Sequence, residues 1–135
     1  MSLLIAGGHV IDPASGTSEL LDVLVEGERI AKIGRNLKGD EVFDARCCVV
    51  CPGLVDIHVH FREPGFESKE TIATGSRAAA RGGVTSVVTM PNTNPPIDNA
   101  GMIEFVNRRA RETAVIKVWP SATATKGRAG AEMTE

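Results

Sequence analysis

A nearly continuous apolar run at Leu54–Phe61 constrains the fold of this chain most strongly. Such a run is typical of a strand whose two faces are both covered, as in parallel sheets flanked by helices. Four further segments alternate between helix-like and strand-like patterns: 68–81, 84–90, 100–113 and 114–120. Ser68 is a suitable N-cap for the first helix, and Asp98 or Asn99 for the second. The order predicts an α/β fold with a parallel sheet and right-handed crossovers.

Residues 1–52 have a different pattern, with short apolar runs separated by turn residues. Leu3–Ala6 and His9–Ile11 flank a pair of glycines, which predicts a break between two strands. The runs together predict a small, mostly antiparallel sheet that packs as one layer of a sandwich. The pattern changes at Pro52-Gly53, so we expect two domains, 1–52 and 53–135.

Composition excludes several classes of function. The chain of 135 residues is 42% hydrophobic and 24% charged, and its net charge of −2 gives no basic excess for nucleic-acid binding. Aromatic residues make up only 4%, which leaves few platforms for base stacking. No apolar stretch approaches the roughly 20 residues needed to span a bilayer. The N-terminus lacks the basic and apolar regions of a signal peptide, so we expect a cytoplasmic protein.

Two of the three histidines, His58 and His60, stand two residues apart at the end of the apolar run. Side chains at i and i+2 of a strand share one face, so both imidazoles can bind a single metal ion. Imidazole nitrogen suits zinc, which lowers the pKa of a bound water towards about 7 and polarises carbonyl groups. At the end of a barrel strand, this pair predicts a hydrolytic metal site.

Three polar residues frame the histidine pair. Asp56 shares the predicted strand face, where it either orients an imidazole or caps the loop backbone. Arg62 shares that face if the strand continues, and its guanidinium can hold a carboxylate through two parallel hydrogen bonds. Asn92 follows the second predicted strand and suits an amide or carboxylate oxygen. The alternatives are an ordinary surface arginine and an ordinary turn asparagine.

The remaining histidine and the cysteines carry weaker signals. His9 falls in the predicted sheet of residues 1–52, and we expect it to be structural. The three cysteines are Cys47, Cys48 and Cys51. Cys48 and Cys51 have the C-x-x-C spacing that occurs in redox and zinc motifs. Their flanks are apolar and the second pair of a structural zinc site is absent, which favours burial as small hydrophobic residues. A thiolate-metal or redox module is the alternative.

The segment Asp56–Gly65, with the sequence DIHVHFREPG, resembles dihydroorotases of the amidohydrolase superfamily. Four further segments resemble the same family in the same order: Lys69-Glu70-Thr71, Ala78–Thr85, Met90–Pro96 and Lys126-Gly127. Residues 1–52 are similar to the small composite domain that precedes such barrels. An H-x-H pair is shared across the superfamily, whereas H-x-H-F-R-E-P-G together with M-P-N-T is much narrower.

The resemblance implies a TIM-like (β/α)8 metal-dependent hydrolase barrel preceded by a small β-sandwich domain. It implies the reversible zinc-dependent cyclisation of N-carbamoyl-L-aspartate to L-dihydroorotate in de novo pyrimidine (UMP) biosynthesis. His58 and His60 match ligands of one or two zinc ions, and Arg62 and Asn92 match groups that hold the substrate carboxylate. The resemblance leaves open a homo-oligomer or an aspartate transcarbamoylase partner.

The chain is expected to hold only part of such a site. Catalytic zinc takes three protein ligands, and no histidine follows His60. A complete barrel takes about 250 residues, far more than residues 53–135 supply. The resemblance implies that the acid/base group of the family lies beyond residue 135. We expect the isolated chain to be an inactive N-terminal fragment with an incomplete barrel.

Two other functions remain open. Hydantoinases and allantoinases share the barrel and the histidine pair, but they usually depart around the residues that match Arg62 and Asn92. A non-catalytic interaction module is the second alternative, because the third predicted parallel strand leaves an exposed edge that can pair with another chain.

Overall fold

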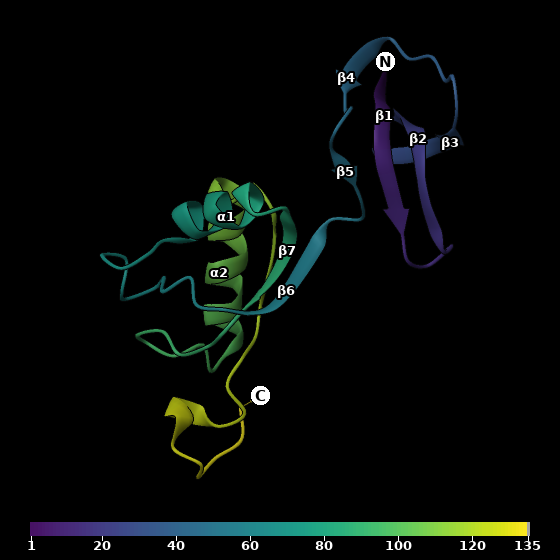
Figure 1. Cartoon of the computed structure of the whole chain (residues 1–135). Coiled ribbons are helices and arrows are strands. Elements are labelled where there is room, and N and C mark those ends of the chain that lie inside the picture. The colour runs from purple at the N-terminus through teal and green to yellow at the C-terminus, as the bar shows by residue number, and fades with distance from the viewer. Residues whose placement is uncertain (135) are drawn as a thin grey trace. The chain divides into compact units, whose positions relative to one another are not determined.

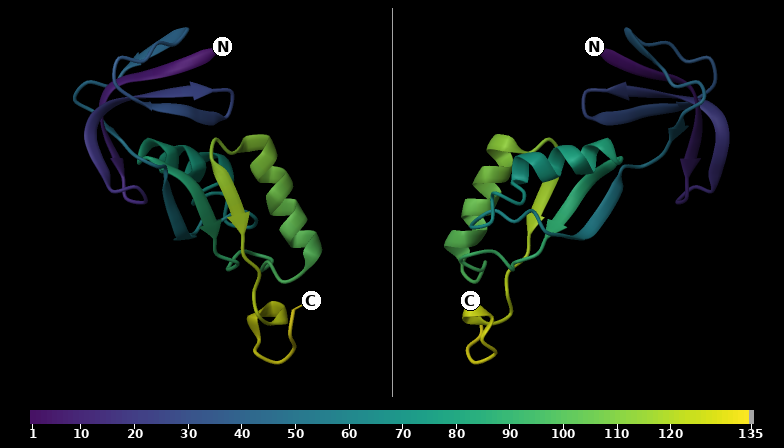
Figure 2. Two further views of the ribbon diagram at one scale, coloured as in Figure 1. Left: turned by 90° about the vertical axis from the view of Figure 1, so that its right-hand side faces the viewer. Right: turned by 60° about the vertical axis from the view of Figure 1, so that its left-hand side comes forward.

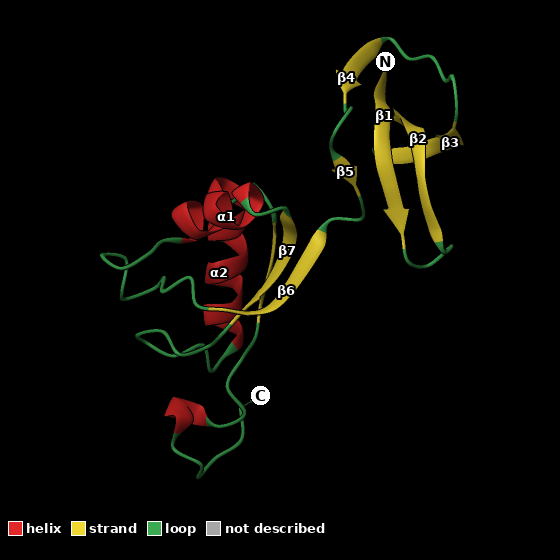
Figure 3. Cartoon of the chain, in the orientation of Figure 1, coloured by secondary structure: helices red, strands yellow, loops and turns green. Residues whose placement is uncertain are grey.

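The computed structural model describes residues 1–134 and divides the chain into two compact units, Met1–Pro52 and Gly53–Glu135. The change in sequence pattern at Pro52-Gly53 falls at this division. Each unit has its own sheet, whose strands are yellow in Figure 3. Within the described residues, none of the helices is both long enough and apolar enough to cross a membrane.

The first unit is a five-stranded sheet (Figure 1). Its strands are β1 (Ser2–Asp12), β2 (Thr17–Glu26), β3 (Arg29–Gly34), β4 (Glu41–Asp44) and β5 (Val49–Val50). Strands β1, β2 and β3 form an antiparallel meander, whereas β4 and β5 each pair with β1 in parallel. The sheet is therefore mixed, and the prediction of antiparallel pairing holds only for β1 to β3.

Strand β1 contains a bulge at the position where the sequence predicts a break. Its pairing with β2 shifts between Ile5 and Gly8, and Gly7 has a φ of 69°. Glycine adopts this left-handed conformation without steric cost, so the strand bends and continues instead of ending. A Cβ on Gly8 would lie 2.5 Å from Val50, so the same glycine pair lets β5 approach β1. The predicted break is wrong.

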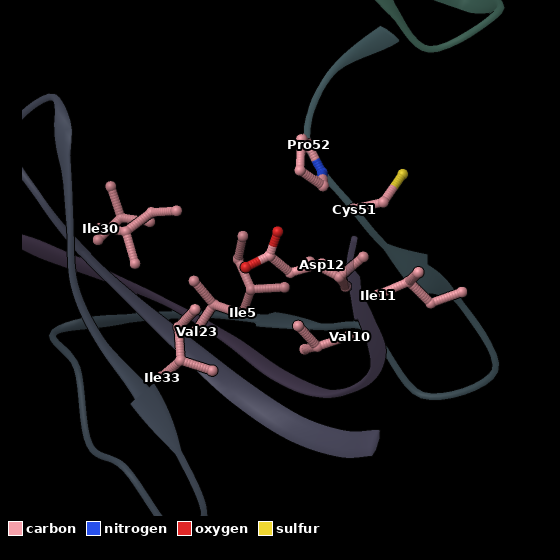
Figure 4. Close-up of a pocket in the computed structure, with 11 residues that line it drawn as sticks. Ile5, Val10, Ile11, Asp12, Val23, Ile30, Ile33, Cys51 and Pro52 are labelled. Atoms are coloured by element: carbon pink, nitrogen blue, oxygen red, sulfur yellow. The ribbon is translucent and has the colours of Figure 1, made fainter. Parts of the chain in front are cut away.

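One face of this sheet is apolar and partly open. Side chains of β1, β2 and β3 line a cavity of about 350 Å³ there, among them Ile5, Val23 and Ile33 (Figure 4). The sequence predicts one layer of a sandwich, and residues 1–52 form this one sheet.

The second unit contains a three-stranded parallel sheet with the order β6-β7-β8. The strands are β6 (Leu54–Val59), β7 (Val84–Thr89) and β8 (Lys117–Pro120), and the connecting helices are α1 (Ile72–Arg81) and α2 (Ala100–Thr113). Both helices cover the same face of the sheet (Figure 2). The predicted β-α-β-α-β order and the parallel sheet are confirmed.

An apolar core lies between these helices and the sheet. Its members are at most 9% exposed: Phe61, Ile72, Val87, Ile97, Val106 and Val118. The two edge strands carry apolar side chains outside this core: Ile57 of β6 is 72% exposed and Trp119 of β8 is 60% exposed. The expectation that both faces of the first strand are covered is therefore not met within residues 1–134.

The helix starts follow local capping. Helix α1 begins after Thr71, not after Ser68 as predicted. The Thr71 hydroxyl accepts a hydrogen bond from the Thr74 N–H (3.1 Å), and the Thr74 hydroxyl accepts one from the Thr71 N–H (2.9 Å). This reciprocal capping box fixes the start three residues later than the sequence suggested. Helix α2 begins after Asn99, one of its two predicted caps.

Residues 132–134 are not helical, and Met133 forms an isolated antiparallel bridge with Thr125. A short 3-10 helix, Lys126–Arg128, lies between the two. Glu135 lies outside the described residues.

The core assignment gives a matched pair of substitutions, because Ile72 is 0% exposed and Ile57 is 72% exposed. We expect Ile72→Ala to lower the free energy of unfolding by about 2–5 kcal/mol, since it leaves a cavity. Ile57→Ala should cost less than about 1 kcal/mol, since it removes an exposed strand side chain. Urea unfolding of the 135-residue chain measures both; equal losses would contradict the assigned core.

Candidate active site

The loops that follow β6 and β7 contact each other where these strands end. The Met90 N–H donates to the Val59 carbonyl (2.8 Å), and the Asn94 N–H donates to the Pro64 carbonyl (3.1 Å). Gly65, with a φ of 95°, lies so close that a Cβ there would be 2.0 Å from the Asn94 carbonyl oxygen. Only glycine fits this position. The two loops therefore form one continuous rim.

The segment that follows β8 joins the same rim. The Thr123 N–H donates to the Ile97 carbonyl (2.8 Å). The Asp98 carboxylate accepts the Gly127 N–H (2.8 Å), and this hydrogen bond lowers the pKa of the Asp98 carboxyl. The carboxyl ends of all three strands are thus tied together at the end of the sheet where barrel enzymes place their active sites.

The two histidines lie at this rim with their rings close together. His58 is in β6, and His60 immediately follows the strand. Their ring centres are 5.2 Å apart, and the ring planes are inclined by 59°. Two imidazoles on one tetrahedral zinc ion, each at about 2.0–2.1 Å, have ring centres roughly 5 Å apart. The observed separation therefore fits a shared ion.

Strand β6 is irregular next to this pair. The register between β6 and β7 shifts between Asp56 and Val59, where β6 contains one more residue than its partner. The Asp56 carboxylate accepts the backbone N–H of His58 (3.0 Å) within this irregularity. Bulges beside active sites commonly redirect a side chain. The sequence left two roles open for Asp56, orientation of an imidazole and capping of the backbone. In the structure its carboxylate caps the backbone.

Asn92 contacts the second histidine directly. Its Oδ1 lies 2.8 Å from Nδ1 of His60. Because Oδ1 is an acceptor in this arrangement, Nδ1 carries the proton, and the Nε2 lone pair remains available for a metal ion. The Nδ2 group of Asn92 can still donate to a ligand. The sequence placed Asn92 at this rim but did not indicate a contact with the imidazole.

Arg62 reaches the rim through a tight turn and not through a continued strand. Its φ is 61°, and the Glu63 N–H donates to the Phe61 carbonyl (2.7 Å) across it. Such a conformation costs a non-glycine residue about 1–3 kcal/mol and persists only where its surroundings enforce it. The strand does not continue to Arg62, so the condition for the alternation argument is not met. Within residues 1–134 its half-buried guanidinium forms no salt bridge.

Glu63 is the residue of this loop that the sequence did not single out. It is 6% exposed. One carboxylate oxygen accepts the Nε–H of Arg109 on α2 (2.7 Å), and the other accepts the N–H of Ile72, the first residue of α1 (2.9 Å). The carboxylate raises the pKa of the Arg109 guanidinium. Next to a proline, a glutamate is typical of an exposed loop, so no local signal indicated its burial.

The other candidate ligands do not form a cluster. All three cysteines are free and exposed, so their predicted burial is wrong: Cys47, Cys48 and Cys51. His9 contacts the Ser18 hydroxyl within the first unit (3.0 Å), in keeping with its structural interpretation. Within residues 1–134, no group of three or more His, Cys, Asp and Glu side chains could hold a metal ion. The histidine pair therefore offers two protein ligands, one fewer than catalytic zinc takes.

Comparisons with known proteins identify the family. A family model described as Dihydro-orotase-like matches residues 47–135. The dihydroorotases of Pelotomaculum thermopropionicum and Aquifex aeolicus are 50% and 43% identical to the chain over 137 residues. Each comparison covers 100% of this chain and 32% of the relative. The chain thus spans about a third of the length of these curated relatives.

Solved structures share the fold. The L-hydantoinase (dihydropyrimidinase) from Arthrobacter aurescens matches with a TM-score of 0.81 at 22% identity, over 91% of this chain and 28% of that protein. The dihydropyrimidinase from Brevibacillus agri matches with a TM-score of 0.76 at 33% identity, over 93% of this chain and 28% of that protein. These likenesses confirm the predicted fold class.

The span matched by the family model contains all four predicted site residues: His58, His60, Arg62 and Asn92. With identities of 43–50% to curated dihydroorotases along its whole length, the chain belongs to the dihydro-orotase-like family.

Proposed function

We propose that the gene product containing this chain, called the full-length polypeptide below, is a dihydroorotase. It interconverts N-carbamoyl-L-aspartate and L-dihydroorotate in pyrimidine biosynthesis. The observation that carries this proposal is the proximity of His58, His60 and Asn92 at one rim, and it is supported by Arg62 two residues further along the same loop. The names of relatives at 43–50% identity support the choice of substrate.

In this proposal His58 and His60 are zinc ligands. The contact with Asn92 leaves Nε2 of His60 free to bind the ion, and the 5.2 Å ring separation suits both imidazoles to the same ion. A bound zinc ion supplies Lewis-acid activation of the ring carbonyl and of water. We assign a third protein ligand and the acid/base group to the part of the full-length polypeptide beyond residue 135, since the chain spans about a third of its relatives' length. The 135-residue chain alone should therefore be inactive.

Arg62 and Asn92 are assigned to the substrate carboxylate. Dihydroorotate carries this carboxylate on its ring, whereas dihydrouracil and hydantoin lack it. The Arg62 guanidinium, which forms no salt bridge within residues 1–134, can form two parallel hydrogen bonds to such a group. The Nδ2 group of Asn92 supplies a further donor beside it.

A hydantoinase-type cyclic amidase is the second candidate. It is favoured by solved hydantoinase structures at 31–35% identity, which match about nine-tenths of this chain. Such an enzyme has no substrate carboxylate for Arg62 to bind. The two candidates therefore differ in what the Arg62 side chain contributes.

The exposed edges of the second unit bear on assembly. Strands β6 and β8 each have one neighbour and carry exposed apolar side chains such as Ile57 and Trp119. Further barrel strands of the full-length polypeptide fit these edges better than a separate interaction partner. A homo-oligomer and an aspartate transcarbamoylase partner remain predictions. Three free, exposed cysteines suit the reducing cytoplasm.

The metal assignment predicts which histidines matter. His58→Ala and His60→Ala in the full-length polypeptide should each lower bound zinc to below about half and abolish dihydroorotate hydrolysis, since each removes a ligand. His9→Ala is the matched control and should change neither quantity. Replacing all three cysteines by alanine should also leave zinc unchanged. Elemental analysis and hydrolysis assays measure the effects. Loss of bound zinc in the cysteine variant but not in the histidine variants would contradict the assignment.

The carboxylate assignment predicts a substrate-dependent effect of Arg62. Hydrogen bonds to charged groups contribute about 1.5–3 kcal/mol, so Arg62→Met should lower kcat/KM for dihydroorotate at least about tenfold. Turnover of dihydrouracil, which lacks the carboxylate, should be unaffected. Arg77→Met, on the exposed surface of α1, is the control. A wild-type polypeptide that hydrolyses hydantoin or allantoin but not dihydroorotate would favour the second candidate.

A further inference from the structure

The loop between β6 and α1 contains a buried charge that the proposed chemistry does not use. Glu63 is 6% exposed, yet its carboxylate forms hydrogen bonds with two different elements, the start of α1 and Arg109 of α2. Burial of a carboxylate is costly unless partners satisfy its oxygens. Here each oxygen has one partner. The loop is therefore fixed at this point to both helices of the unit.

The same carboxylate stands one residue from the strained turn at Arg62. On the other side of that turn, Phe61 is 5% exposed and packs into the core. It lies so close to α1 that a Cβ on Gly75 would be 2.5 Å from its ring. Arg62 thus stands between two anchored neighbours, one held by apolar packing and one by charge. This enforces the positive φ of Arg62.

Helix capping alone does not account for Glu63. The capping box satisfies the N–H groups of Thr71 and Thr74, and Glu63 adds only an acceptor for the N–H of Ile72. Arg109 also has a second carboxylate within reach, since Glu112 lies 3.6 Å from it on the same helix. What the Glu63 contacts add is a connection between the helices and the loop that carries Arg62.

We infer that Glu63, held by Arg109, is a positioning residue that fixes the turn at Arg62 and so directs the guanidinium toward the substrate carboxylate. The inference rests on the proposed function for its substrate. Because the carboxylate is bound equally in the ground state and in the transition state, loss of this positioning raises KM and leaves kcat nearly unchanged. A purely structural role would lower the amount of active protein, and thus the apparent kcat, without a change in KM.

The test uses Glu63→Gln in the full-length polypeptide. Glutamine keeps the size of the side chain and can still accept the Ile72 N–H, but it removes the charge that holds Arg109. The matched control is Glu104→Gln, which removes an exposed carboxylate that pairs with Arg111 on the same helix. Arg109→Lys is the second variant, because it keeps a positive charge and one donor next to Glu63.

Two measurements decide the outcome. Hydrogen exchange of the segment 61–71 should become at least about fivefold faster in Glu63→Gln and stay unchanged in Glu104→Gln. The KM for dihydroorotate should rise about tenfold or more in Glu63→Gln with kcat within about twofold of wild type, and Arg109→Lys should show a smaller rise in KM. Both results together support the inference.

Other results overturn it. Unchanged exchange in Glu63→Gln would show that the carboxylate does not order the turn. Faster exchange with an unchanged KM, or a loss in kcat alone, would show that the turn does not position Arg62 for substrate. Inactivity of the wild-type polypeptide toward dihydroorotate would overturn the proposed function instead, while the exchange comparison would still decide whether Glu63 orders the turn.

Discussion

The close backbone contact between Gly65 and Asn94 is the constraint on which the rim depends. A side chain at position 65 would collide with the Asn94 carbonyl, so the two loops can meet only because this residue is glycine. The contact continues through the hydrogen bond from Asn94 to Pro64. It brings residues 32 positions apart, His60 and Asn92, within 2.8 Å. The pairing of β6 and β7 brings the strand ends side by side, and this contact joins the loops that follow them.

The site also depends on departures from regular strand geometry. The pairing of β6 with β7 shifts register between Asp56 and Val59. Arg62, in a left-handed conformation, then ends the extended backbone. Both deviations are enforced by nearby contacts, namely the Asp56 cap and the buried carboxylate of Glu63. Strain of this kind persists where the surrounding structure holds it, and it often accompanies function. The polar side chains at the rim are thus positioned by loops fixed to a rigid layer of helices.

Features of the fold that arise from local signals could be predicted from the sequence. The apolar run at Leu54–Phe61 and the cap at Asn99 indicate a strand and a helix start without knowledge of distant residues. The histidine pair and Asn92 were placed at strand ends for the same reason. Glu63 was missed because its partner Arg109 lies 46 residues away, and only the folded chain brings the two together. The bulge in β1 depends on its pairing with β2 and β5, which the sequence of β1 alone does not encode.

The most direct test of the account is a crystal structure of the full-length polypeptide with zinc and dihydroorotate, with the metal located by anomalous scattering. The account predicts a zinc peak at about 2.0–2.1 Å from one nitrogen of each imidazole, His58 and His60. It also predicts the substrate carboxylate against Arg62 and Asn92. A zinc peak at the cysteines, or a substrate carboxylate that contacts neither Arg62 nor Asn92, would contradict it.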